Sequence, residues 1–338
     1  MLSRHFLRAK ALQTVYAYRS SNETSPMTAL KDFDKNISRL NELGCLQLAS
    51  LREVVEAGRK IIEEGLHKHL PTEDDLHPSY RVVNNPFLER LFANFDYQQL
   101  ADKYKFPWLE NEDVMRKIYK RYVKSSKFKE LISEESSFDN QQRIVLDLFK
   151  CIINFEDFRD LFNERSLLWE DDFDQVAQYN YAMIKGIEDI TFDESTPLYL
   201  MLDTRVEMDM EANKFVRELI TTTISHIEES EELIKKHLWN WDIERVALMD
   251  ILILDMGIAE LTTCPSIPER VTVDECIELT KEFSSDKSKI FVNGILDKII
   301  VELRNMGRIN KSGRGLYVPE EAVDSDPEHG MVNGVKIN

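Results

Sequence analysis

Hydrophobic positions recur along most of this chain at steps of three and four residues, the period of an amphipathic α-helix. The alternation of apolar and polar residues that marks half-buried strands is rare. Glycine and proline are also scarce, with 11 and 10 residues among 338, whereas a typical chain has about 12 % of the two together. The sequence therefore predicts an all-α fold, with long helical regions over about residues 28–65 and 246–261.

A pair of packed helices is predicted near the end of the chain, in VTVDECIELTKEFSSDKSKIFVNGILD (residues 271–297). Ser284 and Ser285 break the helical pattern in the middle, and Ser288 can cap the helix that follows. On either side, apolar residues recur at helical steps and form one face of each helix. These core-facing residues are Val273, Ile277, Thr280 and Phe283 in the first helix, and Phe291, Ile295, Ile299 and Leu303 in the second.

Gly294 lies on or beside the apolar face of the second helix. A glycine within a helix costs about 1 kcal/mol relative to alanine, and a close helix crossing is the usual reason for one. Asn293 beside it has an amide that can cap or clamp a neighbouring backbone. We expect Phe291, Asn293 and Gly294 to have a structural role at this crossing.

Residues 271–297 resemble the NusB family, the bacterial transcription antitermination and ribosome-biogenesis factors. The family segment has the form V-x-[IV]-[ND]-E-x-[IV]-E-L-[AT]-K-x-[FY], then a short polar turn, then K-x-F-V-N-G-[VI]-L-D. Here Ile290 separates Lys289 from Phe291. The segment WNWDIERVALMDILILDMGIAEL (239–261) is similar to the family's central helix pair, and RHFLRAKALQTVYAY (4–18) is similar to its first helix. The resemblance implies a NusB-like helical bundle built from residues 1–20 and 200–306.

Residues 21–199 lie between these two parts and are predicted to be an acidic insertion, an array of helical hairpins that includes repeats. Within it, NFDYQQLADKYKFPWLENED (94–113) aligns with NFEDFRDLFNERSLLWEDDFD (154–174), and SHIEESEELIKKHLWNWDIER (225–245) has a similar arrangement further on. Three tandem helix–loop–helix units are the simplest account of this similarity. The alternative is chance similarity among acidic, aromatic-rich helices. In the repeat, the equivalent anchors would be Trp108, Trp169 and Trp241.

Two segments are expected to lack a stable fold of their own. Residues 66–86 contain three prolines and are interpreted as a linker. Residues 307–338 are rich in glycine and charge, and are interpreted as a disordered tail.

The cysteines give no sign of a metal centre or a disulfide framework. Cys45, Cys151, Cys264 and Cys276 are scattered and form no Cys-x-x-Cys pair. The first residues lack the apolar core of a signal peptide, and the most apolar helix is too short to span a bilayer. We therefore expect a cytoplasmic protein that uses no metal and no membrane.

The formal net charge of −18 argues against a general nucleic-acid binder, but the charge is unevenly distributed. Residues 1–20 and residues 279–318 each carry +4, so the remainder carries −26. The two basic ends are the parts that resemble the family core. Segregated charge of this kind can still focus an RNA onto one face, and we expect the fold to bring the two basic ends together.

The resemblance implies that the first helix contacts single-stranded RNA. Arg4 and Arg8 lie one turn apart with His5 beside them, where cations fix the register of an RNA and nearby groups read bases. A solvated basic helix start is the other interpretation of this spacing. The family commonly has a denser arginine run here, and we expect Phe6 and Leu7 to be buried or to face a partner.

At the other end, the resemblance implies that the turn between the two packed helices lies beside the RNA. Lys281, Lys287 and Lys289 flank this turn. An ordinary charged loop would show the same pattern, so both interpretations stay open.

Three residues are candidates for a protein-binding surface. In the family, the first and central helices help bind NusE, the small ribosomal-subunit protein, and this implies a role for Tyr16, Tyr18 and Asp250. Core packing is an equally good interpretation of the two tyrosines. Asp255 interrupts an otherwise apolar stripe, and we expect it to face solvent or a partner.

The first hypothesis is an antitermination adaptor. It would bind a boxA-like single-stranded leader of ribosomal RNA transcripts jointly with NusE, and act in the antitermination complex of RNA polymerase. The alternative is a helical protein–protein scaffold without strong RNA binding. A NusB-like domain also precedes some ribosomal RNA cytosine methyltransferases, but the glycine-rich turn and catalytic cysteine of such an enzyme are not found. We therefore expect no enzyme, no cofactor and no small-molecule substrate.

Overall fold

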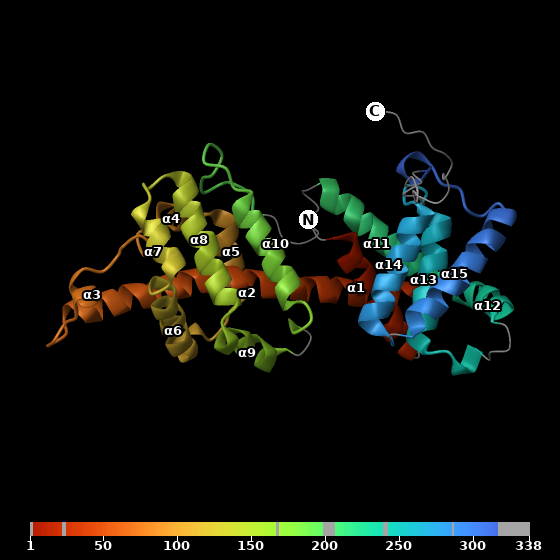
Figure 1. Cartoon of the computed structure of the whole chain (residues 1–338), viewed down its shortest axis with the longest axis horizontal. Helices are drawn as coiled ribbons and strands as arrows, with labels where there is room; N and C mark the ends of the chain where they lie inside the picture. Colours follow the sequence, from red (N-terminus) through yellow and green to blue (C-terminus); the bar gives the residue numbers. More distant parts are fainter. Residues whose placement is uncertain are drawn as a thin grey trace, which may run out of the picture. The chain divides into compact units, whose positions relative to one another are not determined.

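The computed structural model describes residues 3–21, 25–166, 169–198, 207–238, 243–285 and 287–316. The regular structure in these ranges is helical and includes no strand, which confirms the predicted all-α fold (Figure 1). None of the helices described is long and apolar enough to cross a membrane. The chain divides into a first unit, Met1–Thr14 with Met27–Arg217, and a second unit, Val15–Pro26 with Glu218–Asn338. The boundary falls within α1 (Arg4–Ser20) and within α11 (Glu207–Ser225).

The first unit is organised around one long helix, α2 (Pro26–Leu66). Its side chains and carbonyls receive hydrogen bonds from several other elements. The amide of Asn180 donates to the carbonyl of Gly44 at 3.0 Å, and the hydroxyl of Tyr97 donates to that of Leu48 at 3.4 Å. The other helices of this unit are α3 (Glu73–Leu76), α4 (Pro86–Ala93), α5 (Phe95–Lys103), α6 (Glu112–Val123), α7 (Ser126–Ser133), α8 (Phe138–Ile153), α9 (Glu156–Arg165) and α10 (Phe173–Lys185).

Short polar side chains fix where several of these helices begin. Asn85 accepts hydrogen bonds from the backbone N–H groups of Phe87 and Leu88 at the start of α4, and Asn94 accepts one from Tyr97 in α5. Such caps satisfy N–H groups that have no partner within the helix. The segment interpreted as a linker, residues 66–86, also contains a capped helix, because Thr72 begins α3.

The first two copies of the proposed sequence repeat, 94–113 and 154–174, have a similar local structure. Trp108 starts a 3₁₀ helix (Trp108–Asn111) four residues before α6, and Trp169 starts a turn four residues before α10. Their surroundings differ, since Trp169 is 2 % exposed whereas Trp108 is half-buried. Trp241 lies outside the described residues. The three-fold repeat therefore stays a prediction, supported by the local structure of its first two copies.

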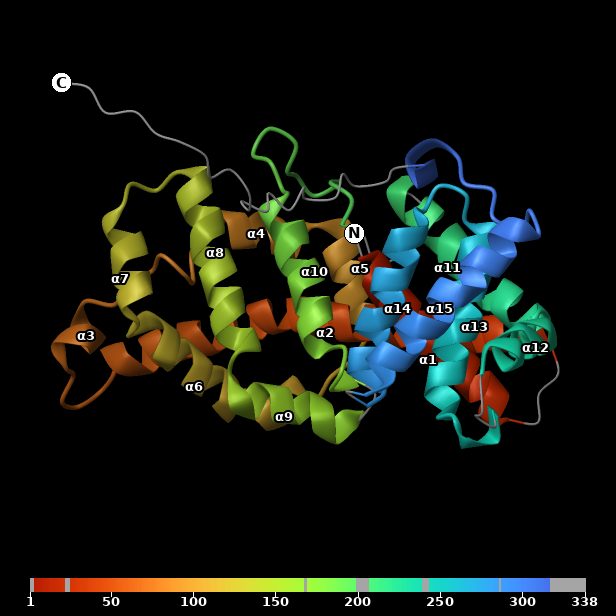
Figure 2. The same ribbon diagram turned by 45° about the vertical axis from the view of Figure 1, so that its right-hand side comes forward.

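The second unit surrounds a buried helix, α13 (Leu248–Thr263), with α12 (Ile227–His237), α14 (Glu269–Phe283) and α15 (Ser288–Asn305). Figures 1 and 2 show α14 and α15 side by side against α13. Every residue of α13 from Asp250 to Leu261 is buried. A helix that is apolar around its whole circumference needs neighbours on all sides, and the other helices supply them.

The close helix crossing is at Gly257 and not at Gly294, which corrects the expectation from sequence. A Cβ atom on Gly257 would lie 3.0 Å from Sγ of Cys276 and 3.2 Å from Cδ2 of Leu296. A Cβ on Gly294 would have nothing within 4 Å. The glycine that permits close packing is therefore in the central helix, where α14 and α15 both approach it.

The buried face of α14 is also rotated from the predicted one. Thr272, Cys276, Leu279 and Thr280 are buried, whereas Val273, Ile277 and Phe283 are half-buried. The hydroxyl of Thr272 donates to the carboxylate of Glu260 at 2.8 Å, and that of Thr280 donates to the carbonyl of Cys276 at 2.7 Å. Because both hydroxyls are satisfied, the threonines can occupy the core.

Part of the segment interpreted as a disordered tail is ordered against the second unit. Gly307, with φ of 69°, ends α15. Further on, the ammonium group of Lys311 donates to the carbonyl of Cys264 at 3.0 Å, and Ser312 N donates to the carbonyl of Pro265 at 2.9 Å. Residues 317–338 lie outside the described residues.

Candidate nucleic-acid interface

Arg4 and Arg8, the predicted RNA-binding arginines, both lie against Phe215 of α11. The guanidinium carbons are 5.3 Å and 5.2 Å from the centre of the ring, a distance at which a cation is attracted to an aromatic face. Arg4 is exposed and His5 is half-buried, but Arg8 is only 3 % exposed. The helix start therefore offers Arg4 to solvent and keeps Arg8 inside.

The residues that directly follow Arg4 and His5 in α1 are buried within the first unit. Phe6 and Leu7 are 8 % and 0 % exposed, which confirms that they are buried. Lys10 is also buried, and its ammonium group lies 2.6 Å from the carboxylate of Asp172. Burial raises the pKa of Asp172 more than the nearby ammonium of Lys10 lowers it. This buried ion pair fixes α1 to the segment that precedes α10.

The turn between α14 and α15 carries the predicted lysines. Lys287 and Lys289 are exposed, and neither forms an ion pair with a residue in the described ranges. Lys281 is exposed too, but its ammonium group lies 2.5 Å from the carboxylate of Glu278. Two of the three lysines therefore present exposed charges, without a partner among the described residues, at the start of a long helix.

Hydroxyl groups hold this turn in place. Ser284 ends α14, and its hydroxyl donates to the carboxylate of Asp250 at 2.5 Å. The hydroxyls of Ser284 and Ser285 lie 3.1 Å and 2.8 Å from that of Ser288, the first residue of α15. Asp250 itself is 4 % exposed. It therefore supports the turn from inside and does not present its carboxylate on the surface.

The two tyrosines differ in exposure. Tyr16 is 42 % exposed, so core packing does not describe it. Tyr18 is half-buried and lines a hollow of about 400 Å³ together with Arg19, Ser21 and the α11–α12 junction. Arg19 is fixed there by an ion pair with Glu231 at 2.6 Å. This end of α1 is an exposed, polar surface of the second unit.

Phe291, Asn293 and Gly294 are all half-buried on α15. Their neighbours Ile295, Ile299 and Leu303 face the core, with exposed fractions of 5 %, 0 % and 0 %. The three residues thus stand at the edge of the packed face.

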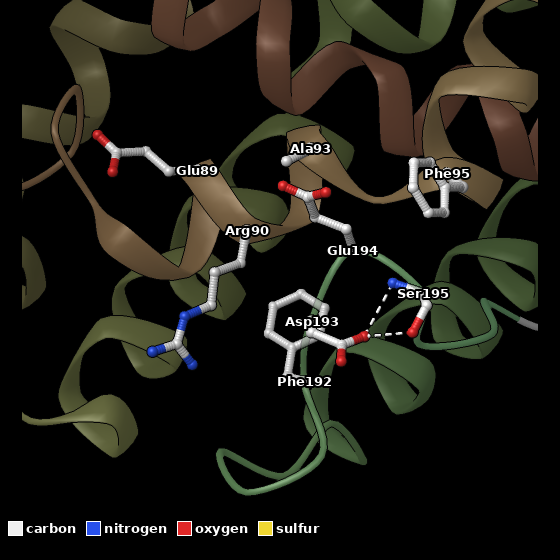
Figure 3. A pocket seen from close by; sticks show the side chains of 8 residues that line it. All are labelled: Glu89, Arg90, Ala93, Phe95, Phe192, Asp193, Glu194 and Ser195. Carbon is white, nitrogen blue, oxygen red and sulfur yellow. Dashed lines mark hydrogen bonds between the residues drawn. The ribbon is translucent and has the colours of Figure 1, made fainter.

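A hollow of about 640 Å³ in the first unit lies between α4 and the loop after α10 (Figure 3). Two of its charged groups have partners already: Arg90 pairs with Asp189 at 2.8 Å, and the carboxylate of Asp193 accepts two hydrogen bonds from Ser195 at 2.8 Å. Figure 3 shows Glu89 and Arg90 pointing in different directions. No set of groups converges on one point there. Among the described residues, no three His, Cys, Asp or Glu side chains are grouped to hold a metal.

Comparison with known proteins identifies the family. The model of the NusB family matches residues 174–301. The transcription antitermination protein NusB of Salinibacter ruber is 36 % identical over 143 residues, which cover 42 % of this chain and 87 % of that protein. The chain belongs to the NusB family. This is a family of transcription antitermination proteins and not of enzymes.

Two other members of the NusB family are similar to this chain over shorter stretches. The transcription antitermination protein NusB of Chloroherpeton thalassium is 39 % identical over 111 residues, which are 33 % of this chain and 53 % of that protein. That of Myxococcus xanthus is 42 % identical over 95 residues, which are 28 % of this chain and 68 % of that protein.

The family match does not follow the predicted division at residue 200. It begins within α10, at Asp174, and ends within α15. Residues 21–173 lie outside it, as do residues 1–20, although α1 carries the pattern of the NusB first helix. The boundary between the two compact units lies elsewhere again. In this part of the chain it falls between Arg217 and Glu218.

Two features of the structure were missed or misjudged from sequence. Asp255 was expected to face solvent or a partner, but it is 0 % exposed and its carboxylate has no hydrogen-bond partner in the described structure. The stretch from Arg116 to Lys129 has seven cations and no acid. A simple scan for charge runs would have found it.

Proposed function

We propose that this chain is an antitermination factor that binds a boxA-like single-stranded RNA of ribosomal RNA transcripts. It binds this RNA together with NusE, as part of the antitermination complex of RNA polymerase. Membership of the NusB family supports the general role. The observation that carries the RNA-binding part is a pair of exposed lysines at the start of α15, Lys287 and Lys289, which form no ion pair with the residues that the structure describes.

The start of α15 suits a phosphate group. The first N–H groups of a helix have no partner within it, and the helix dipole favours an anion there. Lys287 and Lys289 add two mobile cations, while the hydroxyls of Ser284 and Ser288 keep the backbone of the turn fixed. Lys281 contributes only if a phosphate replaces its partner Glu278.

In the first unit, Arg4 provides a different kind of contact. One side of its guanidinium lies over Phe215, and the other can stack on an unpaired RNA base. His5 beside it is half-buried and can add a hydrogen bond. Arg8 is assigned a supporting role, because it is buried under the same ring as Arg4.

The proposed surface for NusE is the exposed end of α1. Tyr16 and Tyr18 provide aromatic contact area, which is enriched at protein interfaces. Asp250 acts indirectly, because its carboxylate holds the turn that bears Lys287. The proposal keeps residues 1–20 and 200–306 as the NusB-like core, residues 21–199 as an acidic insertion and residues 307–338 as a tail.

The alternative, a protein–protein scaffold without strong RNA binding, is favoured by one observation. Arg8 is buried and Arg4 is held against an aromatic ring, so the basic start of α1 offers fewer free cations than its sequence suggests.

One binding experiment separates the two. The affinity of the full chain for a boxA-type RNA is measured across a salt series, with and without NusE. For RNA binding, log affinity falls linearly with log salt, NusE raises the affinity, and Lys287→Ala/Lys289→Ala lowers it. The control is Lys31→Ala/Lys185→Ala, which removes two exposed lysines of the first unit that form no described ion pair. If RNA is not bound even with NusE, the proposal fails and the scaffold remains.

A further inference from the structure

A second basic surface lies outside the region that matches the family. The stretch from Arg116 to Lys129 holds seven cationic side chains and no carboxylate, in a chain with a net charge of −18. It forms the larger part of α6 and the start of α7, which pack against each other and against α8 (Figures 1 and 2). Like charges side by side repel one another, so clustering of this kind is typical of a surface that meets a polyanion.

The first two cations of this stretch have structural partners. Arg116 forms ion pairs with Glu64 of α2 and with Glu112 at the start of α6. Lys117 pairs with Asp157 of α9 at 2.8 Å. These pairs connect α6 to α2 and α9, so both residues have a structural role and are left out of the proposed surface.

The cations that follow are not used in this way. Lys120, Lys124 and Lys129 are exposed, and none of them forms an ion pair with a residue that the structure describes. Lys120 and Lys124 are four residues apart and therefore lie on the same face of the helix end. Their charges are unneutralised by the fold itself.

Arg121 and Lys127 extend this surface. Arg121 is exposed, and its guanidinium carbon lies 5.6 Å from the centre of the Phe155 ring. Among the residues that the structure describes, Lys127 pairs only with Glu130, three residues on, at 3.1 Å. An exposed pair of this kind contributes little to stability, so a phosphate can replace Glu130 readily.

We propose that Lys120, Arg121, Lys124, Lys127 and Lys129 form a second RNA-binding surface that contacts phosphates of the transcript outside the boxA-like element. The proposal rests on the proposed function for the identity of its ligand. The contacts are to the phosphate backbone, where lysine and arginine side chains hold the position of a nucleic acid without reading its base sequence. Lys120 and Lys124 are about one helical turn apart, and Lys127 and Lys129 follow in α7, so these cations can contact successive phosphates of one strand.

The test compares two RNAs and two variants of the full chain. One RNA is the boxA-like element alone, and the other is the same element extended at both ends. Lys120→Ala/Lys124→Ala/Lys129→Ala removes three free cations. The matched control, Lys31→Ala/Lys105→Ala/Lys185→Ala, makes the same change in net charge with exposed lysines elsewhere in the first unit.

For the extended RNA, we expect the α6–α7 variant to bind about tenfold more weakly, with a salt slope shallower by about 2, since each phosphate contact on a single strand contributes about 0.7. For the short RNA, it should bind like the wild type. The control variant should bind both RNAs like the wild type. Thermal unfolding of both variants should match the wild type, because the replaced side chains are exposed.

Each other outcome has a distinct meaning. Unchanged affinity and slope on the extended RNA overturn this inference. If the wild type ignores the short element but its binding to the extended RNA still depends on these lysines, the proposed function fails and this inference stands. If the wild type binds neither RNA, both fail. Salt-sensitive self-association that the α6–α7 variant loses, without any effect on RNA, overturns the inference in favour of an acidic protein partner.

Discussion

The hydroxyl of Ser284 donates a 2.5 Å hydrogen bond to the carboxylate of Asp250, which is only 4 % exposed. Ser284 ends α14, and Asp250 lies in the first turn of the buried helix α13. The bond therefore connects the turn that carries Lys287 and Lys289 to the core of the second unit. This hydrogen bond holds the turn between α14 and α15 in place beside the start of α15.

Replacing Ser284 by alanine should destabilise the second unit. The substitution removes a donor from a buried carboxylate, and a loss of this kind costs about 1–3 kcal/mol. Urea unfolding followed by circular dichroism would measure the change. Ser285→Ala is the control: Ser285 is exposed, and among the described residues its hydroxyl bonds to that of Ser288 and to no carboxylate, so an effect within about 0.5 kcal/mol is expected. Equal effects of the two substitutions would contradict this role of Asp250.

Two glycine-to-alanine substitutions should have opposite effects on stability. Gly257→Ala places a Cβ 3.0 Å from Sγ of Cys276, and overpacking of a core costs about 1–3 kcal/mol. Gly294→Ala adds a Cβ with nothing within 4 Å, so it should stabilise the helix by up to about 1 kcal/mol through helix propensity. The midpoints of urea unfolding would show the two signs. If Gly294→Ala were destabilising instead, a close helix crossing at Gly294, as predicted from the sequence, would be supported.

Helical periodicity and capping residues were sufficient to predict the fold class and the break at Ser284 and Ser285. They were not sufficient to predict which face of α14 is buried. The pattern places Val273 and Ile277 inside together with Thr280, whereas the structure buries Thr280 together with Thr272 and leaves Val273 and Ile277 half-buried. The hydroxyls of Thr272 and Thr280 find acceptors in Glu260 and in the helix backbone, and the first of these comes from another helix, which no local pattern contains.

In the candidate site, too, local sequence patterns could not predict contacts with residues that are distant in the sequence. The lysines at the turn could be predicted as exposed charges, because neighbouring residues in the sequence are polar. The burial of Arg8 could not, since it depends on Phe215, some two hundred residues away in the sequence. Likewise, the buried carboxylate of Asp250 accepts a hydrogen bond from Ser284, which comes from the end of another helix.

The three lysines at the turn should contribute unequally to RNA binding. Lys287 and Lys289 have no described ion pair, whereas Lys281 must give up its contact with Glu278. Lys287→Ala/Lys289→Ala should make the salt slope of binding shallower by about 1.4, at about 0.7 for each phosphate contact with a single strand. Lys281→Ala should change it by less than either single substitution. Fluorescence anisotropy with a boxA-type RNA would measure the slopes, and a larger effect of Lys281→Ala would refute this ranking.

The buried pair Lys10–Asp172 should be costly to break on one side. Lys10→Met leaves the carboxylate of Asp172, 5 % exposed, without its cation, and removing one partner of a buried pair costs about 3–5 kcal/mol. Lys10→Met/Asp172→Leu replaces both charges by apolar groups and should recover most of the loss. Urea unfolding of the single and double variants provides the comparison. Additive losses in the double variant would show that the two side chains act independently.

Asp255 should make the stability of the second unit depend on pH. Burial raises its pKa well above the usual value, and the nearby carboxylate of Glu231 raises it further, against a smaller opposite effect of Arg19. In the unfolded chain an aspartate loses its proton near pH 4, while the folded chain still holds it. Rising pH therefore favours the unfolded state from about pH 4 up to the folded pKa, so the contribution of Asp255 to stability falls over that range.

Asp255→Asn removes this titration and keeps the shape of the side chain. The free energy of unfolding of the variant minus that of the wild type should increase with pH from about pH 4 and level off above the folded pKa. Urea unfolding at a series of pH values would measure this difference. Asp297→Asn is the control for the same substitution at an exposed position of α15. A pH-independent difference for Asp255→Asn would mean that the carboxylate is already ionised in the folded protein, and that some cation reaches it at the centre of the unit.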